Sequence, residues 1–270
     1  MSVTRLHAHT LVVDFLFLQI TIGFIEYSRR SHPPACETDH VSTPPVPIVA
    51  AFDLDGTLSD GGSVFKWLRF ICGSRATFLA AARLAVPLLI GAVRSGSRAD
   101  SAKERLFLAL LNGRDERAVR DESRIFALAH FERHARAEVL ERVTWHLREG
   151  HDVVIVSASP QLYVEVVAEH LGVDGGLGTR LATDARGLLS GGYLGRNCRG
   201  KEKMRRLNAW IEERHPGLET TIYAYGNSRG DRRMLRAATH PFNVGRLGPF
   251  GALRHFPRLR AQDAEALSAE

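Results

Sequence analysis

One short segment constrains the fold of this chain more than any other: an apolar run at residues 46–51 is followed by the sequence FDLDGTL. A short apolar run that ends in turn residues is typical of a buried parallel strand, and open α/β sheets bind ligands beyond the carboxyl ends of such strands. Asp53 and Asp55 are two residues apart, so their side chains point the same way along an extended chain. The segment therefore predicts an α/β protein whose functional site lies just past its first strand.

The residue types in this segment suit phosphoryl chemistry. Two carboxylates at one point can hold a hard cation, and one can attack a phosphorus atom while the other moves protons. Gly56 lets the backbone turn sharply, and Thr57 offers a small donor to a phosphoryl oxygen. The plainer alternative is an acidic turn after a strand, which the segment alone does not exclude.

Three later segments carry the other groups that such a site needs. A second apolar run at 151–156 ends at Ser157, where a hydroxyl and the N-terminus of the following helix can bind a phosphoryl oxygen. A basic helix predicted to begin near Gly200 brings a lysine that can neutralise charge on the phosphoryl group. A last strand at 221–225 leads into residues 226–231, GNSRGD, which supply further oxygen ligands for a cation.

Taken in this order, the four segments resemble the motifs of the haloacid dehalogenase superfamily of phosphohydrolases, and within it the phosphoserine-phosphatase-like branch. The resemblance covers about residues 46–259. It implies a Rossmann-like doubly wound parallel sheet with an inserted α-helical cap. Residues 46–60 and 150–259 would form the catalytic core, and residues 61–149 the cap.

The resemblance also implies a role for each motif residue, with Mg²⁺ as cofactor. Asp53 is then the nucleophile that forms an aspartyl-phosphate, and Asp55 protonates the leaving group and later activates water. The residues implied in catalysis are Asp53, Asp55, Ser157 and Lys203. Those implied in binding the phosphoryl group are Gly56, Thr57, Ser157, Ala158 and Lys203. Those implied in binding the metal are Asp53, Asp55, Asn227 and Asp231.

Two of the motifs leave alternatives open. The fourth motif of the family usually begins Gly-Asp, but here Asn227 stands second, which keeps an oxygen ligand and loses a negative charge. Asp231 can supply the missing carboxylate directly or through a water molecule; the alternative is a decayed site that binds phosphate without turnover. The third motif offers Lys201 and Lys203. We favour Lys203 because it lies four residues before Leu207, as in the pattern of the branch.

The predicted cap has two parts of different character. Amphipathic patterns at 103–111 and 125–147 predict helices. Between residues 76 and 93 the only charged residue is Arg83, and Pro87 stands within a continuous apolar run, where it would kink a helix. Such a segment is either a hairpin buried within the cap or an apolar surface beside the site that touches a membrane or an acyl chain.

Cap residues usually set the substrate in this superfamily. Phosphoserine phosphatases carry a glutamate nine residues after the nucleophile that binds the substrate's amino group, and here that position is Gly62. The phosphatidylglycerophosphate phosphatases of the branch share an apolar cap segment, as a pattern and not as specific residues. We therefore predict a Mg²⁺-dependent phosphomonoester hydrolase that acts on a lipid phosphate. The alternatives are a phosphatase of phosphoserine or another small soluble phosphomonoester, and a non-catalytic phosphate-binding homologue.

Composition bears on partners and location. The net charge of +6 and the pI near 9.6 favour anionic partners, but no nucleic-acid motif is present and no nucleic-acid partner is expected. Three widely spaced cysteines fit a reducing compartment. We expect a cytoplasmic protein, with peripheral contact to the inner face of an anionic membrane as a further hypothesis. Residues 1–45 are predicted to be a poorly structured extension and linker, with a packed element or a weak membrane-surface anchor as alternatives, and residues 260–270 a tail.

Overall fold

The computed structural model of the chain describes residues 46–92, 96–245 and 251–259, with the backbone alone for residues 85–92 and 96–99. The extension predicted at residues 1–45 and the tail predicted at residues 260–270 lie outside the described residues. Within the described residues no helix is long and apolar enough to cross a bilayer.

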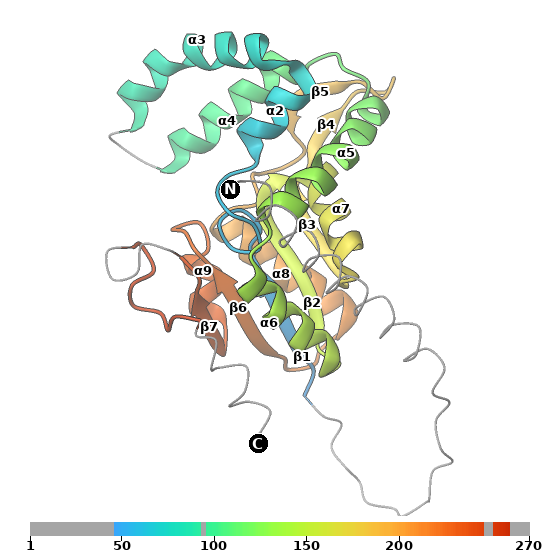
Figure 1. Cartoon of the computed structure of the whole chain (residues 1–270), viewed down its shortest axis with the longest axis vertical. Helices are drawn as coiled ribbons and strands as arrows, with labels where there is room; N and C mark the ends of the chain where they lie inside the picture. The colour runs from blue at the N-terminus through green and yellow to red at the C-terminus, as the bar shows by residue number, and fades with distance from the viewer. Residues whose placement is uncertain (1–45, 93–95, 246–250, 260–270) are drawn as a thin grey trace, which may run out of the picture. The chain divides into compact units, whose positions relative to one another are not determined.

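A five-stranded parallel sheet forms the centre of the fold, with strand order β3-β2-β1-β6-β7 (Figure 1). Its strands are β1 Ile48–Phe52, β2 Asp152–Pro160, β3 Gly175–Thr179, β6 Thr221–Gly226 and β7 His240–Asn243. Phe52, the last residue of β1, is in register with Ile155 of β2 and Tyr225 of β6. The strand order reverses at β1, so its carboxyl end is the topological switch point where such sheets bind ligands. The predicted Rossmann-like α/β fold is confirmed.

β1 is buried on both faces, which explains why its sequence is continuously apolar. Val49, Ala50, Ala51 and Phe52 are all fully buried. Because side chains alternate along a strand, Ala50 and Phe52 join one hydrophobic cluster while Val49 and Ala51 join another on the opposite face.

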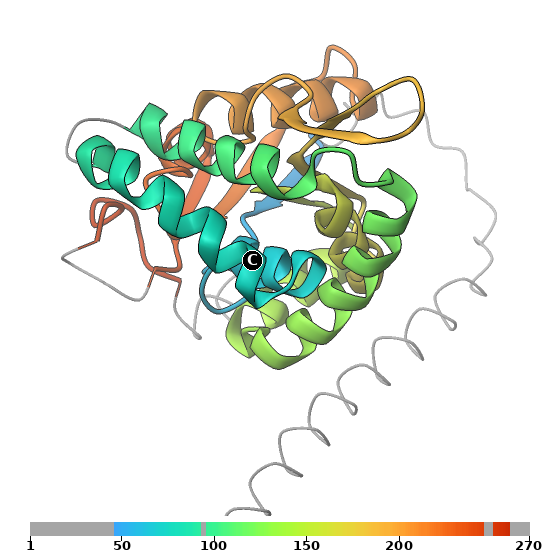
Figure 2. The same cartoon turned by 90° about the horizontal axis from the view of Figure 1, so that it is seen from above.

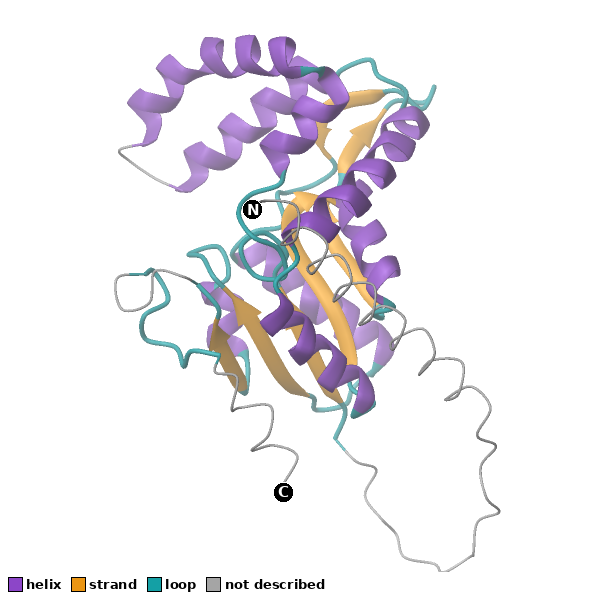
Figure 3. Cartoon of the chain, in the orientation of Figure 1, coloured by secondary structure: helices purple, strands orange, loops and turns teal. Residues whose placement is uncertain are grey.

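Helices cover both faces of this sheet (Figure 3). On the face that carries Phe52 lie α6 (Ala137–Arg148) and α7 (Gln161–Leu171), which contribute residues to the same cluster. On the opposite face lie α8 (Lys201–Arg214) and α9 (Arg232–Ala237). The sheet is therefore doubly wound.

A helical insertion separates β1 from β2 in the sequence. Its helices are α2 Val64–Cys72, α3 Ser74–Ala92, α4 Gly96–Leu111, α5 Glu116–His134 and α6. α3 and α4 run side by side beyond the carboxyl ends of the strands (Figures 1 and 2). An antiparallel ribbon of β4 (Leu181–Thr183) and β5 (Leu189–Tyr193) lies against α4, where a Cβ on Gly191 would fall 2.8 Å from the Phe107 carbonyl oxygen.

One feature of the insertion differs from the sequence prediction. The helical pattern over residues 125–147 is divided into α5 and α6, because Ala135 and Arg136 leave the helical conformation and Ala135 pairs with Ser59 beside the turn after β1. Pro87, where the sequence predicts a kink, lies within α3. The division lets α6 turn back and pack on the sheet.

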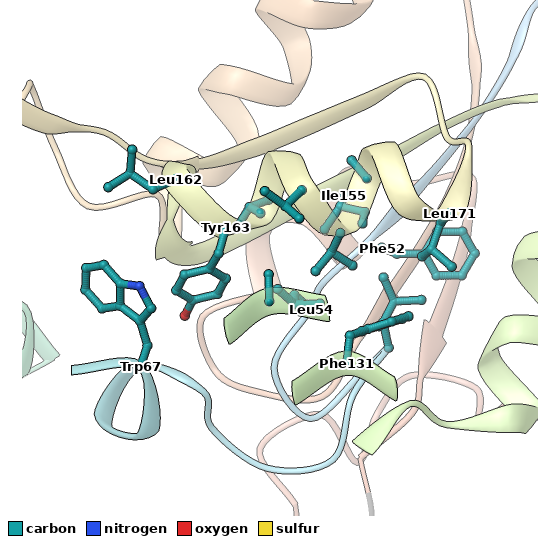
Figure 4. Packing of buried hydrophobic residues seen from close by; sticks show 14 of the residues in the cluster. Phe52, Leu54, Trp67, Phe131, Ile155, Leu162, Tyr163 and Leu171 are labelled. Carbon is teal, nitrogen blue, oxygen red and sulfur yellow. The ribbon is translucent and has the colours of Figure 1, made fainter. Parts of the chain in front are cut away.

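Aromatic packing joins the insertion to the sheet. Trp67 of α2 lies against Tyr163 of α7, with ring centroids 5.7 Å apart (Figure 4). The Trp67 indole donates to Ser123 Oγ at 2.9 Å, and the Tyr163 hydroxyl lies 2.6 Å from Ser63 Oγ. Both rings are fully buried, so they add apolar burial at about 25 cal/mol per Å². This contact holds the start of the insertion against the helix that follows β2.

Candidate active site

The turn after β1 places Asp53 at the carboxyl edge of the sheet. The Asp53 amide donates to the Tyr225 carbonyl oxygen of β6 at 3.0 Å, and the Gly56 amide closes the turn by donating to the Ser59 carbonyl oxygen at 2.7 Å. The Thr57 hydroxyl, fully buried, donates to Asp53 Oδ2 at 3.2 Å. Asp53 itself is 6% exposed, so its carboxylate reaches the surface through a narrow opening.

Lys203, in the first turn of α8, bridges two carboxylates from different strands. Its Nζ donates to Asp53 Oδ1 at 2.8 Å and to Asp231 Oδ1 at 2.5 Å. Leu207, one turn later, packs into the core as expected. Lys201 is exposed at the start of the helix. The structure thus brings Lys203, and not Lys201, to Asp53.

Burial and charge set the protonation of these groups. Burial and the neighbouring Asp231 raise the pKa of Asp53 to about 7, against the opposing effect of Lys203. For Lys203, burial lowers the pKa, but the carboxylates of Asp231 and Asp53 outweigh burial and raise it above its ordinary value. Lys203 therefore stays protonated, and its ammonium group interacts with both carboxylates.

Asp55 is held apart from this pair by two donors. Its Oδ1 accepts the Ser63 amide at 2.9 Å, and its Oδ2 accepts the hydroxyl of Ser159. Burial raises the pKa of Asp55, while the hydrogen bonds from Ser159 and Ser63 oppose the rise. Neither serine was identified in the sequence, because Ser63 belongs to the insertion and Ser159 lies beyond the motif serine.

Ser157 and Ala158 lie near the end of β2 and line the cleft in which Asp53 and Asp55 stand. Ser157 is 1% exposed, and its hydroxyl accepts a hydrogen bond from the Ser159 amide at 3.1 Å. The hydroxyl keeps its own proton for donation, so it can bind a phosphoryl oxygen as predicted.

Lys103, on α4 of the insertion, is a site residue that the sequence did not identify. Its Nζ donates to the Ala158 carbonyl oxygen at 2.5 Å and to Asn197 Oδ1 at 3.0 Å. Burial lowers its pKa to about 8, while nearby carboxylates, including Asp55, oppose the fall. The one signal in the sequence that could have identified Lys103 is the rarity of lysine, since the chain contains only four.

Asp231 is fully engaged by protein donors. Its Oδ2 accepts the Asn227 amide at 3.2 Å, the Ser228 amide at 2.9 Å and the Ser228 hydroxyl at 2.8 Å, while its Oδ1 accepts Lys203. These contacts favour a positioning role, in which Asp231 shapes its own loop and holds the lysine.

Asn227 packs against the turn after β1. A Cβ on Gly56 would fall 1.8 Å from Asn227 Nδ2, and Gly56 has a φ of +82°, so glycine is required there by both space and conformation. Asn227 Oδ1 is buried and accepts no hydrogen bond from any described residue. Gly56 and Asn227 both line a neighbouring cleft of about 510 Å³, and neither lines the cleft that Asp53 lines.

The carboxylate of Asp53 and the side-chain oxygen of Asn227 are the kinds of ligand that suit Mg²⁺, and the two residues line neighbouring clefts. A buried acceptor without a partner costs about 1–3 kcal/mol, and a cation at Asn227 Oδ1 would satisfy it. No three His, Cys, Asp or Glu side chains converge on one metal position in the described part of the chain. Mg²⁺ is commonly held by one or two carboxylates, waters and substrate phosphate. The side chains of Asp53, Asp55 and Asp231, all predicted as ligands, each accept hydrogen bonds from protein donors in this structure.

The cleft has a volume of about 100 Å³. Its lining residues are Asp53, Asp55, Ser157, Ala158, Arg199, Lys203, Ser228, Gly230 and Asp231. Three acidic side chains (Asp53, Asp55 and Asp231) and two basic ones (Lys203 and Arg199) therefore line the same small cleft. Arg199, a second residue that the motifs did not indicate, comes from the loop before α8.

Comparisons of the sequence with known proteins identify its family and its relatives. Residues 50–236 match the family described as haloacid dehalogenase-like hydrolase. Protein CicA of Caulobacter vibrioides is 36% identical over 194 residues, which cover 71% of this chain and 83% of that protein.

Solved structures show the same fold. A protein with unknown function from Bordetella pertussis Tohama I has a TM-score of 0.66 at 21% identity, over 80% of this chain and 99% of that chain. A phospho-aspartyl intermediate analogue of phosphoserine phosphatase has a TM-score of 0.54 at 17% identity, over 83% of this chain and 99% of that chain.

Proposed function

The chain belongs to the haloacid dehalogenase-like hydrolase family, and from that premise we propose that it is a Mg²⁺-dependent phosphatase that hydrolyses phosphomonoesters through an aspartyl-phosphate on Asp53. The observation that carries the proposal is the division of labour between two carboxylates. Lys203 holds Asp53 at the mouth of the cleft, while separate donors hold Asp55 beside it. One carboxylate is thereby placed to attack and the other to move protons.

In the first step the Asp53 carboxylate attacks phosphorus. A bond forms between Asp53 and phosphorus, and the bond to the leaving oxygen breaks as Asp55 gives that oxygen its proton. Lys203 and the Ser157 hydroxyl bind oxygens of the phosphoryl group, so the charge that moves during transfer stays compensated. Mg²⁺, held by Asp53 and Asn227 when bound, supplies further charge neutralisation at the phosphoryl oxygens.

In the second step water displaces the Asp53 carboxylate from phosphorus. Asp55, now a carboxylate, accepts a proton from water, whose oxygen attacks phosphorus. The bond between phosphorus and Asp53 breaks, which releases inorganic phosphate and restores both aspartates to their starting forms.

Asp53→Asn tests this mechanism, because an amide is a far poorer nucleophile than a carboxylate. We expect a loss of turnover of roughly 10³-fold or more on an aryl phosphate, and loss of beryllium fluoride binding measured by calorimetry. Asp121→Asn, which removes an exposed carboxylate from α5, is the matched control. An Asp53→Asn protein that kept a tenth of wild-type turnover would exclude the covalent mechanism, and a wild type without turnover would favour the non-catalytic alternative.

For the substrate we propose a lipid phosphate, presented to the site by the insertion acting as a cap. Apolar side chains on α2 and α3 stand in solvent: Phe65, Phe70, Phe78 and Leu79 are 43%, 51%, 69% and 56% exposed. Clustered exposed apolar side chains commonly mark a lipid or partner surface. Gly62, at the position where phosphoserine phosphatases carry their amino-binding glutamate, supports the same choice over phosphoserine.

Vesicle binding tests the lipid proposal. Phe78→Ser with Leu79→Ser should release the protein from anionic vesicles and lower activity on a vesicle-borne phosphomonoester, with activity on an aryl phosphate retained. Leu218→Ser, an exposed apolar residue in the loop between α8 and β6, should change neither. Wild-type protein that stays in solution with phosphatidylglycerol vesicles at low salt would leave a small soluble phosphomonoester as the substrate class.

A further inference from the structure

Arg199 brings a second positive charge to the cleft that Asp53 lines. It lies in the loop between β5 and α8, two residues before α8 begins. The cleft that it borders has a volume of about 100 Å³ and is also lined by Asp53, Ser157 and Lys203. On the mechanism proposed above, the phosphoryl group binds at these three residues. A side chain that borders this cleft therefore lies close to the transferring phosphate.

The loop of Arg199 is tied to the loop of Asp231. The Gly200 amide donates to the Gly230 carbonyl oxygen at 3.0 Å. A Cβ on Gly230 would fall 3.0 Å from Arg199 Nε and 3.1 Å from Arg199 Cγ, so the arginine side chain runs directly across this glycine. Its backbone and its stem are both fixed relative to the carboxylate that holds Lys203.

The insertion sets the direction of the guanidinium. Arg199 donates to Asp100 Oδ1 of α4 at 3.4 Å, and Asn197 Nδ2 donates to the same oxygen at 2.8 Å. A guanidinium has five N–H donors, and this contact uses one of them. The Arg199 side chain is 35% exposed, whereas that of Lys203 is 2% exposed and engaged by two carboxylates. Of the two cations that line the cleft, Arg199 is the one with donors left for an incoming anion.

We propose that Arg199 donates hydrogen bonds to the oxygens of the phosphoryl group that Asp53 attacks, and that Asp100 positions it for this. The inference deepens the phosphatase function proposed above and rests on it. Arginine presents parallel donors that match two oxygens of a phosphate, which a lysine cannot do. Arg199 also adds a positive charge beside that of Lys203 at the cleft where the phosphoryl dianion would enter.

Binding of inorganic phosphate tests the proposal without turnover or a leaving group. Isothermal titration in MgCl₂ would compare the wild type with Arg199→Gln, Arg199→Lys and Arg196→Gln, the last being an exposed arginine of the same loop. We expect Arg199→Gln to weaken phosphate binding by roughly tenfold or more, as for loss of a charge-assisted contact. Arg199→Lys should recover part of the loss, Arg196→Gln should match the wild type, and KM for an aryl phosphate should rise in the same order.

Three results would overturn the inference. One is unchanged phosphate affinity in folded Arg199→Gln protein. Another is an equal loss in Arg196→Gln, which would show a general effect of charge. The third is a loss confined to substrates with a second anionic group, such as phosphoserine, because Arg199 would then recognise the leaving group. A wild type that binds phosphate through Arg199 but hydrolyses no phosphomonoester would instead defeat the proposed function and leave Arg199 as a ligand of bound phosphate.

Discussion

The Asn227 side chain lies over Gly56 so closely that a Cβ on Gly56 would fall 1.8 Å from the Asn227 amide nitrogen. The first and fourth motifs are therefore in direct contact through a glycine without a side chain and an asparagine whose side-chain oxygen has no hydrogen-bond partner among the described residues. Asn227, which we propose as a metal ligand, and the turn that carries Asp53 therefore depend on each other for their positions.

Gly56→Ala should separate these two residues. The new methyl group must displace Asn227, and its backbone at φ +82° disfavours any residue with a Cβ, which costs about 1–3 kcal/mol. Gly61→Ala is the matched control, because Gly61 has a φ of +72° but nothing within 4 Å of the point where a Cβ would lie. Urea unfolding should show destabilisation in both, larger in Gly56→Ala because Asn227 must also move, and only Gly56→Ala should lose activity, by about tenfold or more. Equal activity in the two variants would contradict the contact.

Asn227→Asp should strengthen the metal site. A carboxylate supplies the full negative charge that the amide oxygen lacks, so the Mg²⁺ concentration for half-maximal rate should fall, by about tenfold. Titration of activity with MgCl₂ measures the change, and direct Mg²⁺ binding by calorimetry confirms its origin. An unchanged requirement would show that Asn227 Oδ1 does not face the metal.

Asp231→Asn distinguishes the positioning role from the metal role that the family resemblance implies. Breaking one half of a buried ion pair with Lys203 should destabilise the fold by about 3 kcal/mol. If Asp231 positions Lys203, kcat should fall with little change in the Mg²⁺ requirement. A sharp rise in that requirement would return Asp231 to the metal ligands.

His146 should make folding sensitive to acid. It is fully buried between α6 and β6, with Nε2 at 2.9 Å from the Tyr225 hydroxyl and Nδ1 at 2.8 Å from His151 Nδ1. Burial, with smaller contributions from the nearby His151 and Arg142, lowers its pKa to about 2. Because this is below the value of about 6.5 in an unfolded chain, only the unfolded state gains the proton as pH falls below about 6.5.

The resulting loss of stability reaches about 1.4 kcal/mol per pH unit for this one group. His146→Gln removes the titration while keeping a donor and an acceptor for Tyr225. Urea unfolding of the wild type and His146→Gln between pH 7.5 and about 4.5 should therefore give free-energy curves that converge as pH falls. Parallel curves would mean that His146 is protonated in the folded state.

The parts of this protein that the sequence predicts are those encoded locally. The apolar run of β1 and the carboxylates that follow it are adjacent in the chain, and parallel pairing then brings Lys203 to Asp53 across 150 residues. The family motifs predicted this contact between Lys203 and Asp53, because the order of the strands determines which loops lie together at the carboxyl edge of the sheet. The resemblance to haloacid dehalogenase-like hydrolases is confirmed at the level of the family.

The parts that escaped prediction depend on tertiary contacts. The helical pattern over residues 125–147 has no breaker at Ala135, whose pairing with Ser59 divides the helix. Lys103 carries an ordinary helical pattern, and only the packing of α4 on the core brings it to Ala158. Arg199 is one of many arginines, and its place in the cleft follows from the bond between Gly200 and Gly230.

The Ser63 contacts have a consequence for exchanging insertions between relatives. Ser63 is the last residue before α2, yet its amide donates to Asp55 and its hydroxyl contacts Tyr163 of α7. A chimaera joined at residue 60 would replace Ser63 with the relative's residue, lose the hydroxyl contact that fixes this amide, and so change the position of Asp55, which we propose as the acid and base. The structure therefore sets the outer crossover after Ser63, so that specificity can be recombined while the acid–base geometry is inherited with the core.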